Sequence, residues 1–226
     1  MSIATPDSDK TREHLRIETS AKRVRAYLGG EVVADTIHPR LVWEKPYYPT
    51  YYLPAEDVRI DLLKGIPDAI KRFDDSPVEE LRDLVRLDWD AMDAWFEEDE
   101  EVFVHPRSPY TRVDILPSSR HVRVDVDGIT IAESTSPRIL FETGPPVRYY
   151  LSKMHVRMDL LTPTDTVTRC PYKGQARYWS VRIGDEVHED LAWSYPTPLP
   201  ESERIAGMIA FYNDRVDLYV DGVLQE

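Results

Sequence analysis

Hydrophobic and polar residues alternate in short runs along most of this chain. Val122, Val124 and Val126 are each separated by one polar residue, the period of two that a half-buried β-strand requires. Comparable runs flank Gly29-Gly30 and Asp127-Gly128, two-residue sequences that tolerate the positive φ angles of tight hairpin turns. The pattern predicts a mainly β protein in which each half begins with a hairpin.

The same pattern occurs twice, because residues 23–63 and 121–161 align without a gap at a spacing of 98 residues. Identical residues occupy 15 of the 41 aligned positions, where average composition would give about 2 or 3. We therefore expect a flexible N-terminal arm at residues 1–20, a first module at 21–117 and a second module at 118–226. The identical pairs include Gly30 and Gly128, Pro39 and Pro137, Glu44 and Glu142, Tyr51 and Tyr149, and Tyr52 and Tyr150.

Beyond residue 63 the two copies differ, although Ala94-Trp95 and Ala192-Trp193 are again 98 residues apart. In the first copy, Ser76 followed by Pro77 and Glu79 is typical of the start of a helix. Leu81, Leu84 and Val85 would then form its apolar stripe. The sequence predicts a helix here, at the place where the second copy carries residues 170–174, Cys-Pro-Tyr-Lys-Gly.

Composition and charge exclude several classes of function. The net charge of −13 and a pI near 4.9 disfavour binding to nucleic acid or to an anionic membrane. The first 20 residues are polar and no apolar run is long enough to span a membrane, so we expect a cytoplasmic protein. A single cysteine excludes an intramolecular disulfide and a four-cysteine zinc site. We expect no metal and no cofactor.

A family resemblance rests on motifs that are complete only in the second module. They are Arg123, Gly128, Ala132, Glu133, Pro137, Glu142, Tyr149-Tyr150, Val156-Arg157, Cys170-Pro171-Tyr172-Lys173-Gly174, Tyr178-Trp179, Ala192-Trp193-Ser194-Tyr195 and Asp221-Gly222. With these residues the chain resembles a tandem member of the bacterial family known as domain of unknown function 427, sometimes labelled nucleotidyltransferase-like. No motif here carries that label, since the chain lacks a Gly-Ser pair followed by spaced aspartates and a glycine-rich phosphate loop.

The resemblance implies two tandem β-tent-like modules, the first modified by the predicted helix. This fold is similar to the yippee, cereblon ligand-binding and methionine sulfoxide reductase B types. Those relatives hold zinc with four cysteines, so in this chain packing would have to replace the metal.

The candidate catalytic residues are Cys170 and Lys173. Positive charge from Lys173 and Arg169 would favour a thiolate, and His155 or His188 could act as its base if the fold brings one of them close. The alternative is a buried structural thiol. Lys173 would either bind an anionic group or form an ion pair with Glu142 or Asp159.

The candidate ligand-binding residues are mostly aromatic. Tyr178 and Trp179 cannot face the same side of one strand, whereas Trp193 and Tyr195 can, so the second pair is the better candidate for a pocket wall. The full set is Glu142, Tyr150, His155, Tyr172, Trp179, Trp193 and Tyr195. The sequence leaves the role of His105-Pro106-Arg107 in the first module open.

Three functional hypotheses follow. The first is binding of a small ring-bearing or anionic metabolite in the second module or between the modules. The second is an enzyme that uses Cys170 as a nucleophile or redox group. The third is a scaffold whose motif residues maintain the fold and a homodimer.

Overall fold

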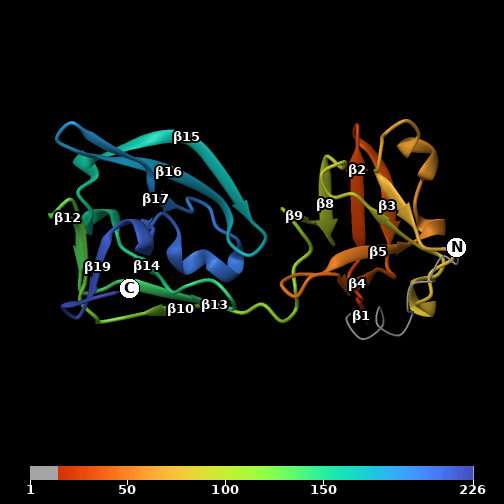
Figure 1. Ribbon diagram of the computed structural model, residues 1–226, viewed down its shortest axis with the longest axis horizontal. Coiled ribbons are helices and arrows are strands. Elements are labelled where there is room, and N and C mark those ends of the chain that lie inside the picture. The colour runs from red at the N-terminus through yellow and green to blue at the C-terminus, as the bar shows by residue number, and fades with distance from the viewer. Residues whose placement is uncertain (1–14, 226) are drawn as a thin grey trace, which may run out of the picture. The chain divides into compact units, whose positions relative to one another are not determined.

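The computed structural model describes residues 15–225 and divides into two compact units, the first ending at Ser108 and the second beginning at Pro109 (Figure 1). The protein is mainly β, as the alternating pattern predicts, and the strand pairs of the described residues are all antiparallel.

The first unit contains two sheets, with strand orders β1-β4-β5-β7-β6 and β3-β2-β8-β9. Its strands are β1 (Arg16–Thr19), β2 (Val24–Leu28), β3 (Glu31–Thr36), β4 (Arg40–Trp43), β5 (Thr50–Pro54), β6 (Ile70–Arg72), β7 (Leu84–Leu87), β8 (Ala94–Glu97) and β9 (Glu100–Val102). Short 3-10 turns lie at η1 (Ala55–Asp57), η2 (Ile60–Leu63) and η3 (Glu79–Leu81).

The second unit contains three sheets, with orders β10-β13-β14, β12-β11-β19-β20 and β15-β16-β17-β18. Its strands are β10 (Val113–Pro117), β11 (Val122–Val126), β12 (Ile129–Ser134), β13 (Arg138–Glu142), β14 (Arg148–Tyr150), β15 (Leu161–Cys170), β16 (Gly174–Ile183), β17 (Glu186–Ser194), β18 (Ala210–Phe211), β19 (Asp217–Val220) and β20 (Val223–Leu224). Its 3-10 helices are η4 (Lys153–His155), η5 (Met158–Leu160), η6 (Pro200–Ile205) and η7 (Asn213–Arg215).

The first strands of the two units pair in the same register. The hairpins β2-β3 and β11-β12 form as predicted across their Gly-Gly and Asp-Gly turns. Both hairpins shift register at equivalent places, after Ala26 in one and after Val124 in the other. The aligned residues therefore occupy the same positions in two similar arrangements of strands.

Strand β10 belongs to the second unit, although its residues were expected to close the first module. It pairs with β13, and β1 pairs with β4 in the equivalent register, with Arg16 opposite Trp43 and Asp114 opposite Phe141. Because Ile115 is buried in the second unit, the structural division falls after Ser108 rather than after residue 117. Of the predicted flexible arm, residues 16–19 form a strand, and residues 1–14 lie outside the described part of the chain.

The helix predicted in the first module is wrong beyond the single turn η3. The Ser76 hydroxyl accepts a hydrogen bond from the Val78 amide and not from the amide three residues on. Asp83 then has a φ of 63°, which ends the helical path. Leu84 and Val85 lie in strand β7, where neighbouring residues point to opposite faces and are buried in two different clusters.

Ala94-Trp95 and Ala192-Trp193 do not occupy equivalent places in the two units. Strand β8 pairs with β2 and sets Trp95 opposite Ala26. In the second unit the strand in that place is β19, which sets Leu218 opposite Val124. Both strands turn directly into a short partner, β9 or β20. The spacing of 98 residues between the two Ala-Trp pairs is therefore coincidental.

Candidate functional site

Residues 170–174 form the tight turn that joins β15 to β16, with Cys170 paired to Gly174. Gly174 has a φ of +90°, and a Cβ there would lie 3.4 Å from the backbone nitrogen of Leu199, so glycine permits this close approach. The ammonium of Lys173 meets the carboxylate of Glu142 at the end of β13, and these side chains are only 11% and 9% exposed. The ion pair with Glu142, one of the two predicted alternatives, is present.

Tyr150, Trp193 and Tyr195 belong to one buried aromatic cluster and are 1%, 7% and 6% exposed. The indole N–H of Trp193 donates to the Tyr150 hydroxyl at 3.2 Å. The guanidinium of Arg148 lies 5.4 Å from the centre of the Trp193 ring, and the Tyr212 ring lies 4.6 Å away. Burial raises the pKa of Tyr150 and of Tyr195. Protein groups therefore surround the Trp193 ring.

The thiol of Cys170 is half-buried at the edge of this cluster. Neither predicted base is paired with it. The His155 Nδ1 lies 2.8 Å from the Ser134 hydroxyl, and the His188 Nε2 lies 2.7 Å from a carboxylate oxygen of Asp127. Within the described contacts, a nucleophilic Cys170 would lack a histidine base.

Two of the remaining predicted residues, His155 and Trp179, do not belong to the aromatic cluster. Trp179 packs against the other core of the unit, with the Lys153 ammonium 5.4 Å from its ring centre, while Tyr178 lies in the aromatic cluster. The Tyr172 carbonyl accepts a hydrogen bond from Ser202 at 3.1 Å. The structure brings together Glu142, Tyr150, Cys170, Lys173, Trp193 and Tyr195, but not His155 or Trp179.

The first unit contains a cleft of about 320 Å³ whose floor is aromatic. The rings of Trp89 and Trp95 stack with centres 4.9 Å apart and planes 8° from parallel, and Tyr51 lies 5.7 Å from Trp95. Trp95 is buried, whereas Trp89 is only half-buried. Other lining residues are Glu44, Lys45, Tyr48, Arg86, Asp88, Asp90, Val104 and His105.

One wall of the cleft is a second stacked pair. The Tyr48 and His105 rings lie 4.0 Å apart with planes 11° from parallel. Burial lowers the pKa of His105, and this effect outweighs the hydrogen bond between its Nδ1 and the Pro106 carbonyl, which acts in the opposite direction. The imidazole is therefore neutral at pH 7, and the wall is an uncharged aromatic surface.

The charged rim of the cleft is centred on Glu44. The Arg86 Nη1 lies 2.9 Å from both carboxylate oxygens of Glu44, and the Tyr52 hydroxyl donates to the same carboxylate. Burial raises the pKa of Tyr52, and its hydrogen bond to Glu44 adds to this shift. Glu44 is the repeat equivalent of Glu142, so each unit pairs this glutamate with a cation.

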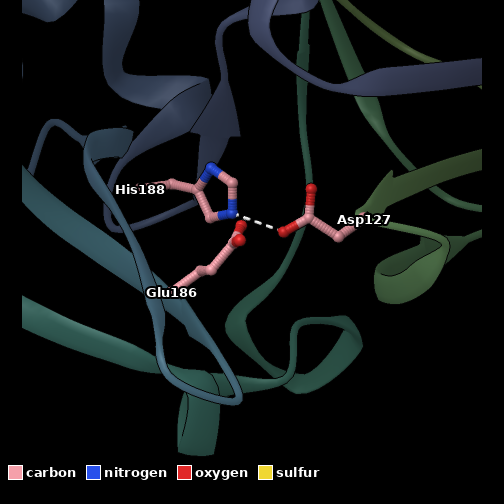
Figure 2. Close-up of side chains that lie close together, drawn as sticks. All are labelled: Asp127, Glu186 and His188. Carbon is pink, nitrogen blue, oxygen red and sulfur yellow. Dashed lines mark hydrogen bonds and ion pairs between the residues drawn. The ribbon is translucent and has the colours of Figure 1, made fainter.

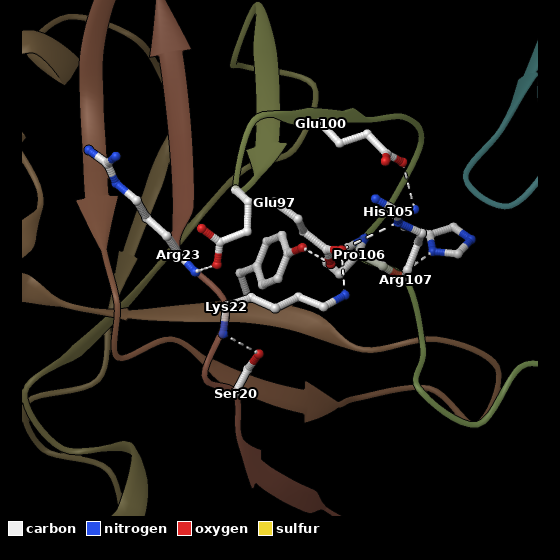
Figure 3. A network of polar contacts seen from close by, with 10 residues as sticks. Ser20, Lys22, Arg23, Glu97, Glu100, His105, Pro106 and Arg107 are labelled. Atoms are coloured by element: carbon white, nitrogen blue, oxygen red, sulfur yellow. Dashed lines mark hydrogen bonds and ion pairs between the residues drawn. The ribbon is translucent and has the colours of Figure 1, made fainter. Parts of the chain in front are cut away.

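A buried carboxylate holds the loop that carries His105 (Figure 3). Glu97 is 4% exposed and lies 3.3 Å from Nε of Arg107 and 2.6 Å from Nζ of Lys22. It also accepts a hydrogen bond from the Tyr51 hydroxyl at 2.6 Å. Because Tyr51 also lines the cleft, this network ties the cleft floor to the loop that forms its wall.

The cleft lies outside the site that the sequence predicts. Its recognisable signals are the spacing of Trp89 and Trp95, the flanking Asp88 and Asp90, and the downstream His105. The carboxylate of Asp88 accepts hydrogen bonds from the amides of Asp90 and Ala91, which turns the chain after β7 and sets Trp89 into the cleft. Sequence reasoning missed this arrangement because it assigned β7 to a helix.

Within residues 15–225, no helix combines the length and the apolar character needed to cross a membrane. A comparison with curated proteins gives no match. The sequence does match a family described as a domain of unknown function, DUF427, over residues 16–70 and 114–222. The first match runs from β1 to the start of β6, and the second runs from β10 to the turn after β19, so both cover the aligned strands, β1 to β5 in the first unit and β10 to β14 in the second. Since these segments make up well over half of the chain, the protein belongs to the DUF427 family.

Proposed function

We propose that this protein binds a small planar aromatic ligand that carries a charged group, in the cleft of the first unit. The observation that carries the proposal is the stacked Trp89–Trp95 pair in the floor of a cleft of about 320 Å³. Small-molecule sites typically combine apolar and aromatic walls with a few polar groups in a volume of roughly 300–1,000 Å³. The cleft has these properties.

The walls favour a flat ring over an aliphatic chain. Trp89 and the Tyr48–His105 pair offer π-surfaces from different segments of the chain, and a neutral His105 adds no charge to repel or attract a ring substituent. Stacking of a ring on one aromatic side chain contributes about 1–3 kcal/mol to binding, judged by alanine substitution at nucleic-acid sites.

The rim favours a charged substituent. Lys45 and Asp90 both line the cleft and form no ion pair with another described residue, in contrast to Glu44 and Arg86, which pair with each other. A carboxylate on the ligand would meet Lys45, and an amine would meet Asp90. The ligand class is therefore an aromatic acid, an aromatic amine or a compound with both groups.

The second unit is the other location considered for a ligand. Lys173 is engaged by Glu142, and Trp193 is covered by Arg148 and Tyr212, so a ligand there would have to displace protein contacts. The first-unit cleft requires no such displacement, which is why the proposal places the ligand there.

The test is a panel of aromatic acids, aromatic amines and nucleobases, screened by ligand-observed NMR and measured by tryptophan fluorescence. We expect at least one class to bind, and we expect Trp89→Ala to weaken it by about tenfold or more, the loss of one stacking contact. Trp179→Ala is the matched control, because Trp179 is a half-buried tryptophan of the other unit, and it should bind as the wild type does.

Two outcomes would contradict the proposal. One is a panel with no binder at millimolar concentration. The other is a ligand whose affinity is unchanged in Trp89→Ala and lost in Lys173→Met, which would move the site to the second unit.

A further inference from the structure

Three side chains of metal-ligand type converge in the second unit, outside both sites described above. They are Asp127, Glu186 and His188 (Figure 2), and their ligand atoms all lie within 4.8 Å of one another. The Nε2 of His188 lies 2.7 Å from a carboxylate oxygen of Asp127. Figure 2 shows the Glu186 carboxylate beside that contact, so one nitrogen and two carboxylates face a common point.

The backbone sets these side chains together from two separate hairpins. Glu186 and His188 are two residues apart on β17, so they project from the same face of the strand. Asp127 occupies the tight turn between β11 and β12 with a φ of 50°, next to Gly128 with a φ of 75°. Hydrogen bonds to neighbouring strands fix both hairpins, so the cluster does not depend on a single loop.

The two carboxylates have no basic partner other than the imidazole. No lysine or arginine of the described residues pairs with Asp127 or Glu186, although most other close carboxylate contacts in the chain involve arginine. Two neighbouring negative charges without a fixed cation repel each other. A bound dication would remove that repulsion. The uncompensated negative charge therefore favours a metal ion here, in addition to the clustering of the three side chains.

We propose that Asp127, Glu186 and His188 bind a divalent first-row transition ion, of which Zn²⁺ and Co²⁺ are the best suited. Imidazole with carboxylate suits such ions, whereas Mg²⁺ and Ca²⁺ prefer sites built from oxygen alone. Three protein ligands leave at least one coordination position for water, as in open zinc sites. Asp127 and Glu186 are exposed and His188 is partly exposed, so water can reach the ion.

The geometry needs only a small adjustment. Tetrahedral ligands at about 2.0–2.1 Å from zinc are roughly 3.3 Å apart. The His188–Asp127 contact of 2.7 Å is a hydrogen bond that would open by a fraction of an ångström as the metal replaces its proton. Because these side chains are partly or fully exposed, rotamer changes suffice.

The site is specific to the second unit and does not depend on the ligand cleft of the first. The repeat equivalent of Asp127 is Gly29, which has no side chain to offer. The first unit also has no counterpart of the β16-β17 hairpin among its described strands. We therefore expect one metal ion per chain.

The experiment uses the full-length protein without a histidine tag, freed of metal by chelation. Co²⁺ is added and its visible absorption followed, with Zn²⁺ competition and calorimetry as second measurements. We expect one equivalent to bind. His188→Ala and Glu186→Gln should each weaken Co²⁺ binding by at least about 10- to 100-fold. Removing a residue that only hydrogen-bonds to a metal ligand already has an effect of this size.

The chain offers a matched control in a second histidine–carboxylate pair. His121 Nε2 lies 2.7 Å from Glu133, in the same unit and with similar exposure, but this pair is not part of a three-ligand group in the described chain. His121→Ala should bind Co²⁺ as the wild type does. The proposal is overturned if the wild type takes up no Co²⁺, or if His121→Ala and His188→Ala weaken binding equally.

Discussion

The two units share an arrangement of strands, and the contacts that hold its edges recur in both. Arg25 lies over the Phe96 ring in the first unit, and Arg123 lies over the Tyr219 ring in the second. Phe96 and Tyr219 are equivalent in strand register, although they are not aligned by the spacing of 98 residues. The arrangement therefore keeps its arginine–aromatic contact while the intervening chain changes length.

The turn that closes each arrangement is also shared. The Glu98 carboxylate accepts a hydrogen bond from the Arg23 amide, and the Asp221 carboxylate accepts one from the His121 amide. Glu98 and Asp221 both have positive φ angles, 52° and 53°. Residues 97–101, which are all acidic, thus include a turn at Glu98 that is equivalent to the turn at Asp221.

The units differ in the segment between the shared strands. In the first unit a short β6-β7 hairpin follows η2 and leaves an open cleft. In the second, the long β15-β16-β17 strands follow η5. Their first turn supplies Lys173 to the equivalent glutamate, and their residues Tyr178 and Trp193 pack into an aromatic core. The comparison teaches that similar strands can border either a cleft or a core, depending on what the connecting segment buries.

The largest expected effect tests a buried charge at a strand position that is apolar in the second unit. Glu97 is equivalent in register to the buried Val220, yet it interacts with Lys22, Tyr51 and Arg107. Glu97→Val should destabilise the first unit by about 4 kcal/mol, because Arg107, whose side chain is only 14% exposed, loses its contact with this carboxylate and keeps the one with the more exposed Glu100. The Tyr51 hydroxyl also loses a hydrogen-bond acceptor. Hydrogen exchange followed by mass spectrometry can assign the loss to peptides of one unit.

A double variant sharpens this comparison. Replacing the charged pair with apolar residues, as in Glu97→Val with Arg107→Met, should recover most of the loss, since a buried pair is often no more stable than an apolar replacement. If Glu97→Val alone is neutral, the network contributes nothing to the stability of the first unit.

An intermediate effect separates the two glutamate–cation pairs. Lys173→Met should cost about 3 kcal/mol, because Glu142 is 9% exposed and would be left buried without a partner. Arg86→Met should cost less than about 1 kcal/mol, because Arg86 and Glu44 are each about one-third exposed. Chemical denaturation followed by unit-specific exchange gives both values. Equal losses of stability would show that burial by the β15-β16-β17 segment does not change the strength of the glutamate–cation pair.

The smallest effect is a pH dependence confined to the first unit. Burial lowers the pKa of His105, so the unfolded chain takes up the proton first as the pH falls. The stabilisation that neutral His105 contributes to the folded first unit is complete above the ordinary histidine pKa of about 6.5. It is lost as the pH falls through the pKa of His105 in the folded protein. Thermal unfolding at pH 7.5, 6.5 and 5.5 should show a larger decrease for the wild type than for His105→Phe, which keeps the stacking on Tyr48.

His38→Gln serves as the control for this measurement, since His38 is exposed in the same unit. It should lose stability with falling pH as the wild type does. Parallel curves for the wild type and His105→Phe would remove His105 as the source of the pH dependence.

Much of the fold can be predicted from the sequence, but the candidate sites cannot. The paired turns at Gly29-Gly30 and Asp127-Gly128 predict their hairpins correctly because turn residues and alternation act over a few neighbouring positions. Residues 76–85 mislead because helix-start signals are equally local, whereas Leu84 and Val85 are buried on opposite faces by distant strands.

The sequence by itself determined the β class and the paired hairpins, since each depends on residue type and short-range spacing. Only the tertiary structure decided that Trp193 and Tyr195 are packed while Trp89 lies in a cleft. It also decided that His188 meets Asp127, 61 residues away, rather than Cys170. The physical reason is that burial and long-range contacts depend on which segments cover one another, and residue spacing within one strand carries no record of that.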